Sequence, residues 1–306
     1  MKEKMILLNE KLIERERKIP HSTVLRKKLK EHGDFIHISQ MSKTEILDFS
    51  KSKGLMGVDG SYMTMGETFP NILFLAQAIA KSTNAPKETV RNVDIFSGLL
   101  DGGEEDINEY SKKVAEMEVQ VALQGLEKFN PFAVFLDGGF WRLTKNCTNK
   151  GKNLWNKFSK LCIEGNHLLV GVIEDVGSYE LCDKIELETV FHDRDLMFGI
   201  LGIGEVYFLK EPYKGDFLKV FARFSKDPMS IACDFLPQQK DSVLNMLKFI
   251  YSLTPINERG IPLWCDIVDK EVKITKEMAC SIVSSYIDPV LQEKILTGKR
   301  NRRSLF

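Results

Sequence analysis

The sequence lacks the motifs that identify several large classes of enzyme. Its six cysteines contain no CxxC pair, and its five histidines show no HxxxH or HExxH spacing, so a zinc site is not expected. It contains no GxSxG and no Walker A motif, which weakens a serine hydrolase or a P-loop interpretation. The carboxylates are therefore the main candidates for chemistry.

Long apolar runs are lacking as well. The most apolar run, Leu196 to Gly204, is far too short to span a bilayer. The N-terminus is charged from Lys2 onward and has no apolar region of the kind found in signal peptides. Scattered cysteines without a pairing pattern indicate free thiols in a reducing compartment. We therefore expect a cytoplasmic protein.

The chain of 306 residues also lacks a net charge, with 43 Lys and Arg against 43 Asp and Glu. The total argues neither for nor against nucleic acid, because local segregation of charge matters more. Residues 1–31 hold ten Lys and Arg against five Glu, and residues 299–303 add four more positive charges. These runs are either solvated surface or contacts to a phosphate backbone. The candidate contacts in the first run are Arg26, Lys27, Lys28 and Lys30.

The order of the expected elements predicts an α/β protein. Residues 1–50 read as a helical arm that is broken at Pro20, and residues 51–306 read as one domain. Strands are expected over 55–59, 62–65 and 71–78 as an antiparallel meander, followed by an acidic loop over 101–106. The next elements alternate between helix and strand, which is the pattern of parallel crossover units. They are a helix over 107–128, a strand over 132–137, a helix over 153–164 and a strand over 168–173. Later strands are expected near 205–209 and 218–224, and helices near 241–252 and 275–296.

Two apolar strands are each followed by aspartate and glycine. The first ends in Asp59-Gly60, which predicts a turn that holds Asp59 at the end of its strand, and the second ends in Asp137-Gly138. The helix between them carries Glu118 within the apolar stripe formed by Val114, Met117 and Val121. We therefore expect these three acids to gather at one place.

A gathering of three buried acids points to metal chemistry. A single carboxylate at a strand end usually binds a turn, but three buried together are costly unless a cation compensates them. Mg²⁺ and Mn²⁺ prefer such oxygen ligands. A pair of these ions can activate water and stabilise the leaving oxygen of a phosphodiester.

The motifs around these acids resemble those of the NurA nuclease family. The resemblance runs from about Gly54 to Ile287, and the order and spacing of short motifs carry it. These motifs are Gly57-Val58-Asp59-Gly60-Ser61, Met117-Glu118, Val134-Phe135-Leu136-Asp137-Gly138-Gly139, Leu169-Val170-Gly171-Val172, Gly204-Glu205, and Gly260-Ile261-Pro262-Leu263 followed by Asp269.

The resemblance implies an RNase H-like mixed β-sheet flanked by helices. It also implies a homodimer, a DNA nuclease that depends on Mn²⁺ or Mg²⁺, and a HerA-type hexameric ATPase as partner in DNA end processing and repair. The implied activity is a 5′–3′ exonuclease with single-strand endonuclease activity. Asp59, Glu118 and Asp137 match the family's catalytic, metal-binding acids, and Asp269 takes the place where members carry a His or Asp that completes the site.

Two positions depart from the family's pattern. Many members carry Tyr where this chain has Ile261, and a Lys often stands where it has Glu174. These departures favour a rival interpretation, a non-catalytic DNA-end clamp or translocase adaptor. A third interpretation, an actin-like phosphotransferase, would need an adenosine-binding glycine motif in the second half, and the sequence shows none.

Overall fold

The computed structural model of the protein describes residues 1–66, 71–101, 107–187, 191–211 and 217–296. The chain divides into two compact units, each built from two segments of sequence. The first unit comprises Met1–Lys43 and Val172–Pro262, and the second comprises Thr44–Gly171 and Leu263–Phe306. The expected division into a helical arm over 1–50 and a domain over 51–306 stays a prediction.

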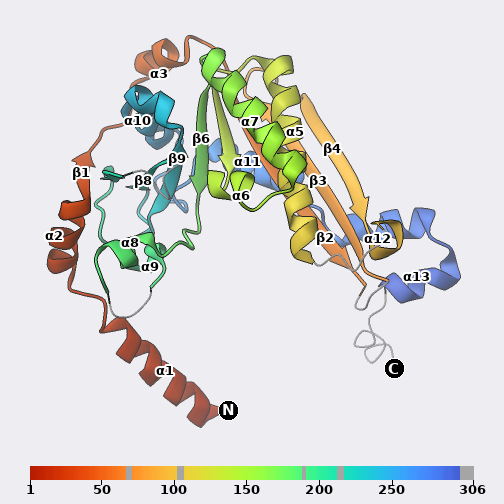
Figure 1. Cartoon of the computed structure of the whole chain (residues 1–306), viewed down its shortest axis with the longest axis horizontal. Coiled ribbons are helices and arrows are strands. Elements are labelled where there is room, and N and C mark those ends of the chain that lie inside the picture. Colours follow the sequence, from red (N-terminus) through yellow and green to blue (C-terminus); the bar gives the residue numbers. More distant parts are fainter. Residues whose placement is uncertain (67–70, 102–106, 188–190, 212–216, 297–306) are drawn as a thin grey trace. The chain divides into compact units, whose positions relative to one another are not determined.

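A mixed sheet forms the centre of the second unit (Figure 1). β2 (Leu55–Met65), β3 (Leu73–Ser82) and β4 (Thr89–Phe96) form an antiparallel meander. β5 (Ala133–Asp137) pairs with β2 in parallel, and β6 (Leu168–Ile173) follows β5 in the strand order. Parallel and antiparallel pairs thus meet at β2.

The expected turn at Gly60-Ser61 is wrong, because β2 is one continuous strand of 11 residues. Gly60 pairs with Ala78 and Ser61 with Gln77, and the long buried strand β3 supplies these partners. The tertiary ladder overrides the local turn signal. The meander itself is confirmed, but its third strand is β4, which the sequence did not indicate.

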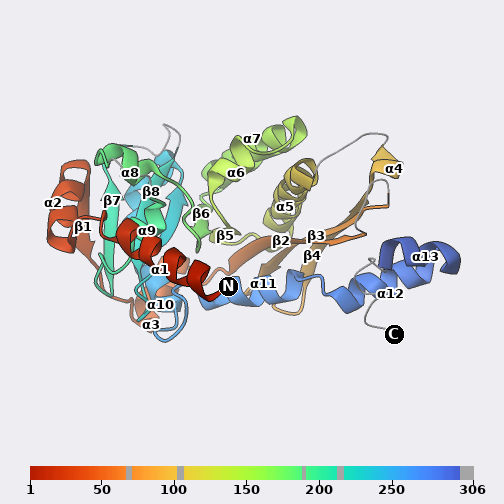
Figure 2. The same ribbon diagram turned by 90° about the horizontal axis from the view of Figure 1, so that it is seen from below.

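Helices cover both faces of this meander (Figure 2). α5 (Ile107–Phe129) packs on one face, and α11 (Leu263–Val272) packs on the other. α7 (Asn149–Glu164) lies against α5. The apolar stripe expected for α5 is confirmed, since Val114, Met117 and Val121 are all buried.

The first unit contains an antiparallel sheet. β1 (Gly33–His37), β7 (Glu205–Leu209), β8 (Leu218–Arg223) and β9 (Ile231–Phe235) pair in that order. α2 (Ser22–His32) buries Leu25 and Leu29, and the Tyr207 hydroxyl donates to the Leu29 carbonyl at 2.8 Å. α1 (Lys2–Glu16) buries none of its side chains. The helical break expected at Pro20 is confirmed, because α1 ends at Glu16 and α2 begins at Ser22.

The other described elements are α3 (Lys43–Ser50), α4 (Gly98–Asp101), α6 (Phe140–Thr144), α8 (Glu180–Lys184), α9 (Asp193–Met197), a 3-10 helix at Pro237–Ser242, α10 (Val243–Leu253), α12 (Lys276–Tyr286) and α13 (Pro289–Leu296). The single helix expected over 275–296 is two helices, because Pro289 cannot continue the hydrogen bonding of α12. Within the described ranges, no helix combines the length and apolar character needed to cross a membrane. The α/β class with a mixed sheet flanked by helices is confirmed.

Candidate active site

Asp59 and Asp137 lie on neighbouring parallel strands. The pairing of β2 with β5 runs from Leu55–Ala133 to Val58–Leu136. Asp59 and Asp137 are the next residues of the two strands, so the ladder brings them side by side. Asp137 ends its strand as expected. Asp59 does not, because β2 continues beyond it to Met65.

Glu118 joins this pair from α5. It is only 3% exposed and lies on the buried side of its helix. A Cβ atom on Gly60 would stand 2.5 Å from Glu118 Oε1, so no larger residue fits beneath the glutamate. This close approach explains a glycine in the middle of β2, where glycine is otherwise unfavourable.

The Asp59 carboxyl loses its proton much less readily than an ordinary aspartic acid. Its burial is the largest cause, and the negative charges of Asp137 and Glu118 come next; together they raise the pKa of Asp59 to about 8. Asp269 of α11 adds a smaller upward contribution. The Gly60 N–H, which donates to Asp59 Oδ1 at 2.6 Å, acts in the opposite direction. Each of the other three expected acids therefore lies within electrostatic reach of Asp59.

The acids approach from different sides of β2. A Cβ on Gly57 would meet Val268 and Trp264 of α11, and Ser61 Oγ accepts a hydrogen bond from the Ile274 N–H just after that helix. Alternation along the strand places Asp59 on this same side, which is also the side of Asp269. Glu118 comes from the α5 side.

Arg142 is the functional residue that the sequence reasoning missed. Its Nη1 donates to Glu118 Oε1 at 2.9 Å, its Nη2 donates to Glu118 Oε2, and Nη2 also donates to the Asp137 carbonyl at 3.0 Å. Burial raises the pKa of the Glu118 carboxyl, and the charge of Arg142 opposes this rise. The signal was present, because a glutamate inside an apolar stripe favours a nearby cation, and Arg142 lies in the short helix α6, 5 residues after Asp137.

The donor set fits a divalent cation. The four carboxylates outnumber the two cations beside them, Arg142 at Glu118 and Lys273 at 3.8 Å from Asp269 Oδ2. Burial and this excess of negative charge together raise the pKa of Asp59. Hard divalent cations take ligands of this kind. As the side chains stand, however, no three His, Cys, Asp or Glu residues in the described ranges meet closely enough to hold a metal ion.

A profile of the NurA domain matches residues 53–274, which include all four acids. The chain belongs to the NurA family. A solved structure of the NurA nuclease from Sulfolobus solfataricus is similar, with a TM-score of 0.60 and 13% identity over 92% of this chain and 94% of that chain. This likeness supports the mixed α/β fold, a sheet flanked by helices, that the resemblance implied.

Other similarities are weaker. The catalytic domain of human endonuclease V matches with a TM-score of 0.36 and 13% identity over 87% of this chain and 98% of that chain. Endonuclease V from Ciona intestinalis matches with a TM-score of 0.39 and 17% identity over 89% and 99%. No curated protein sequence matches this chain.

The positions that depart from the NurA pattern are both in the first unit. Ile261 is buried, with 5% exposed. Glu174 pairs with Arg259, whose Nη1 lies 2.8 Å from Glu174 Oε2. The carboxylate that replaces a lysine of the NurA pattern therefore has a cation beside it.

Two of the four expected DNA contacts take part in the packing of the first unit. Arg26 pairs with both oxygens of Glu205 at 2.9 and 2.5 Å and stacks 4.0 Å from the centre of the Phe35 ring. Lys28 Nζ donates to the Ile185 carbonyl at 3.1 Å. Lys27 and Lys30 are exposed. Most of the acidic loop over 101–106 and the basic run over 299–303 fall outside the described residues.

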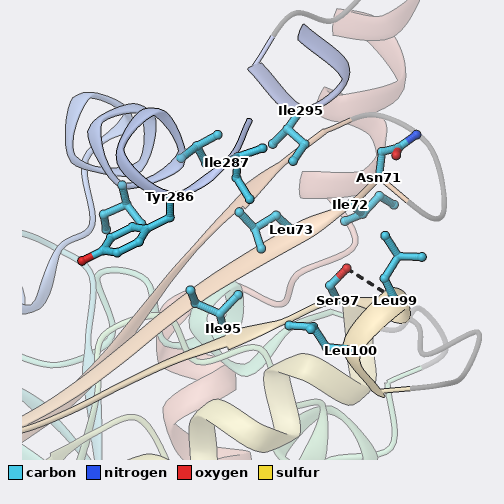
Figure 3. Close-up of a pocket in the computed structure, with 12 residues that line it drawn as sticks. Asn71, Ile72, Leu73, Ile95, Ser97, Leu99, Leu100, Tyr286, Ile287 and Ile295 are labelled. Carbon is cyan, nitrogen blue, oxygen red and sulfur yellow. Dashed lines mark hydrogen bonds between the residues drawn. The ribbon is translucent and has the colours of Figure 1, made fainter. Parts of the chain in front are cut away.

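An apolar cavity of about 440 Å³ occupies another part of the second unit (Figure 3). Aliphatic side chains from β3, β4, α4, α12 and α13 form most of its wall, and Ser97 Oγ accepts a hydrogen bond from the Leu99 N–H at 3.4 Å. None of the four acids lines it. The cavity is therefore separate from the candidate active site of this NurA chain.

Proposed function

We propose that the protein is a metal-dependent DNA nuclease. The observation that carries the proposal is the register of β2 and β5, which sets Asp59 beside Asp137 while buried Glu118 approaches from α5. Burial first, and then the charges of the other acids, raise the pKa of Asp59. A cluster of this composition suits phosphodiester hydrolysis by divalent cations. Membership of the NurA family and the fold of the Sulfolobus solfataricus nuclease support the same conclusion.

Asp59, Glu118, Asp137 and Asp269 would hold Mn²⁺ or Mg²⁺. When bound, such an ion supplies activation of water and neutralisation of the charge on a phosphate. The chain itself orients the acids. The Gly60 N–H fixes Oδ1 of Asp59, the β2–β5 ladder holds Asp137 beside it, and α11 brings Asp269 to the same side of β2.

The finer parts of the proposal follow the NurA family. They are 5′–3′ exonuclease and single-strand endonuclease activity in DNA end processing and repair, a homodimer, and a HerA-type hexameric ATPase as partner. A second candidate function is a non-catalytic DNA-end clamp or translocase adaptor. The observation that favours this second candidate is the engagement of both Glu118 oxygens by Arg142.

A time course of cleavage separates the two candidates. Single- and double-stranded DNA, labelled at either end, is incubated with the protein and Mn²⁺, Mg²⁺ or EDTA. A nuclease shortens the DNA with a divalent ion and not with EDTA, and the label that is lost first gives the polarity. DNA that is bound but uncut with both ions would favour the adaptor.

We expect the double substitution Lys27→Gln and Lys30→Gln to weaken DNA binding. Each phosphate contact that is lost lowers the slope of log affinity against log salt by about 0.7–0.9. Binding isotherms at several salt concentrations measure this slope. The double variant Lys226→Gln and Lys240→Gln removes two exposed charges from the same unit and is the control. An unchanged slope in the first variant means that this helix does not contact phosphate.

We also expect Trp141→Ala to weaken binding of single-stranded DNA by about tenfold, the amount that corresponds to one lost stacking interaction. Trp141 immediately precedes Arg142. Trp141 is 41% exposed, whereas Trp155 is buried. Trp141 is therefore not enclosed in the core. Fluorescence anisotropy in EDTA measures the affinity without cleavage.

The matched control for the tryptophan is Leu161→Ala, which removes another partly exposed apolar side chain, 39% exposed, from the same unit. This variant should bind single-stranded DNA as the wild type does. Equal affinities for all three proteins would exclude a stacking role for Trp141.

A further inference from the structure

Arg142 engages Glu118 in the manner of a bound cation. Its two terminal nitrogens contact the two carboxylate oxygens, and the second nitrogen also binds the Asp137 carbonyl. The planar guanidinium matches a carboxylate in this two-point geometry. The Glu118 side chain is 4% exposed and that of Arg142 is 35% exposed. The glutamate is thus enclosed, while the arginine still reaches solvent.

The turn after β5 places Arg142 there. Gly138 has a φ of +88°, which favours glycine, and α6 begins two residues later. A Cβ on Gly171 would lie 2.7 Å from the Gly138 carbonyl, so β6 packs closely against this turn. Arg142 therefore starts from a well-supported backbone, and its long side chain can move while the turn stays in place.

A divalent cation and this guanidinium would repel each other if both contacted Glu118. Like charges a few ångströms apart repel, and the glutamate side chain between them is only 4% exposed. Metal ligation requires at least one oxygen of Glu118 to face the ion. Both oxygens now face Arg142. Entry of the ion would therefore require the ion pair to loosen.

We propose that Arg142 is a positioning residue that holds Glu118 in the metal-free chain and competes with the divalent cation for it. This inference rests on the proposed metal-dependent function. Arg142 thereby keeps a buried carboxylate paired before the ion arrives and makes ion binding weaker than the four acids alone would allow. Release of Glu118 leaves the guanidinium exposed on the solvent side of the cluster.

Titration with Mn²⁺, followed by electron paramagnetic resonance at pH 8.5, tests the competition. We expect Arg142→Gln to bind Mn²⁺ about tenfold more tightly than the wild type, an effect within the usual range of coupling between two sites. Arg142→Lys keeps the charge but not the two-point contact. Its affinity for Mn²⁺ should lie between those of the wild type and Arg142→Gln. Lys157→Gln, which removes an exposed charge from α7, should match the wild type.

The outcomes separate this inference from the proposed function. Equal Mn²⁺ affinity in the wild type and Arg142→Gln, or weaker binding in the variant, overturns the competition and leaves the nuclease proposal standing. The absence of Mn²⁺ binding to every protein overturns both.

If Arg142→Gln does not fold, nitrogen NMR of the Arg142 guanidinium in the wild type tests the competition for Glu118 instead. Addition of Mg²⁺ should turn the restrained signals of a two-point ion pair into those of a freely rotating group. Signals that stay restrained while Mg²⁺ is bound contradict the proposal.

Discussion

Asp59→Asn is expected to reduce DNA cleavage by about 10³-fold or more while the fold stays intact. The substitution preserves the shape of the side chain and removes its charge. A metal ion supplies several kcal/mol of charge stabilisation in the transition state, and about 4 kcal/mol corresponds to this factor in rate. The rate of loss of end-labelled DNA under saturating Mn²⁺ measures the effect, with circular dichroism as the check on folding.

Asp94→Asn is the matched control for this variant. Asp94 lies on β4 in the same unit and is exposed, so the same chemical change there should leave cleavage at the wild-type rate. A similar loss of activity in both variants would show that the effect is not specific to the acid cluster. Full activity in Asp59→Asn would remove Asp59 from the mechanism.

The stability of the metal-free protein is expected to fall as the pH rises from about 4 to about 8. The folded pKa of Asp59, about 8, lies above the ordinary value of 3.8, so between these values the folded state binds more protons than the unfolded state. The free energy of unfolding then decreases with pH and levels off above the folded pKa. At about 1.4 kcal/mol for each unit of pKa, the total is on the order of a few kcal/mol.

Thermal unfolding in EDTA over this pH range measures the slope. Asp59→Asn should flatten it and should melt higher than the wild type at pH 8, by about 2–4 °C for each kcal/mol recovered. Asp94→Asn should keep the wild-type slope. A wild-type melting temperature that rises steadily from pH 4 to pH 8 would show that the pKa of Asp59 is not strongly raised in the folded protein.

The sequence predicted those parts of the site that depend on strong local patterns. α5 was predicted nearly to the residue because its apolar stripe repeats with helical spacing over many turns, and this pattern placed Glu118 on the buried side. β5 was predicted because a short apolar run ends in Asp137 and a glycine with positive φ follows. Both signals lie within a few residues of the acid that they place.

Other features depend on partners far away in the sequence. Gly60 reads as a turn locally, but the ladder to β3 and the contact with Glu118 require it inside a strand. α11 and Asp269 occupy their place through packing on β2, which no local pattern near residue 269 reveals. The arginine partner of Glu118 is 24 residues away along the chain, and only the fold brings the two together.

Anomalous diffraction from crystals grown with Mn²⁺ tests the central claim most directly, because it locates the ion among the side chains. The account predicts a strong peak bounded by the carboxylates of Asp59 and Asp137, with Glu118 turned from Arg142 toward the ion. Mn²⁺ bound elsewhere, with Asp59 and Asp137 facing no metal and the ion pair of Glu118 with Arg142 unchanged, would contradict it.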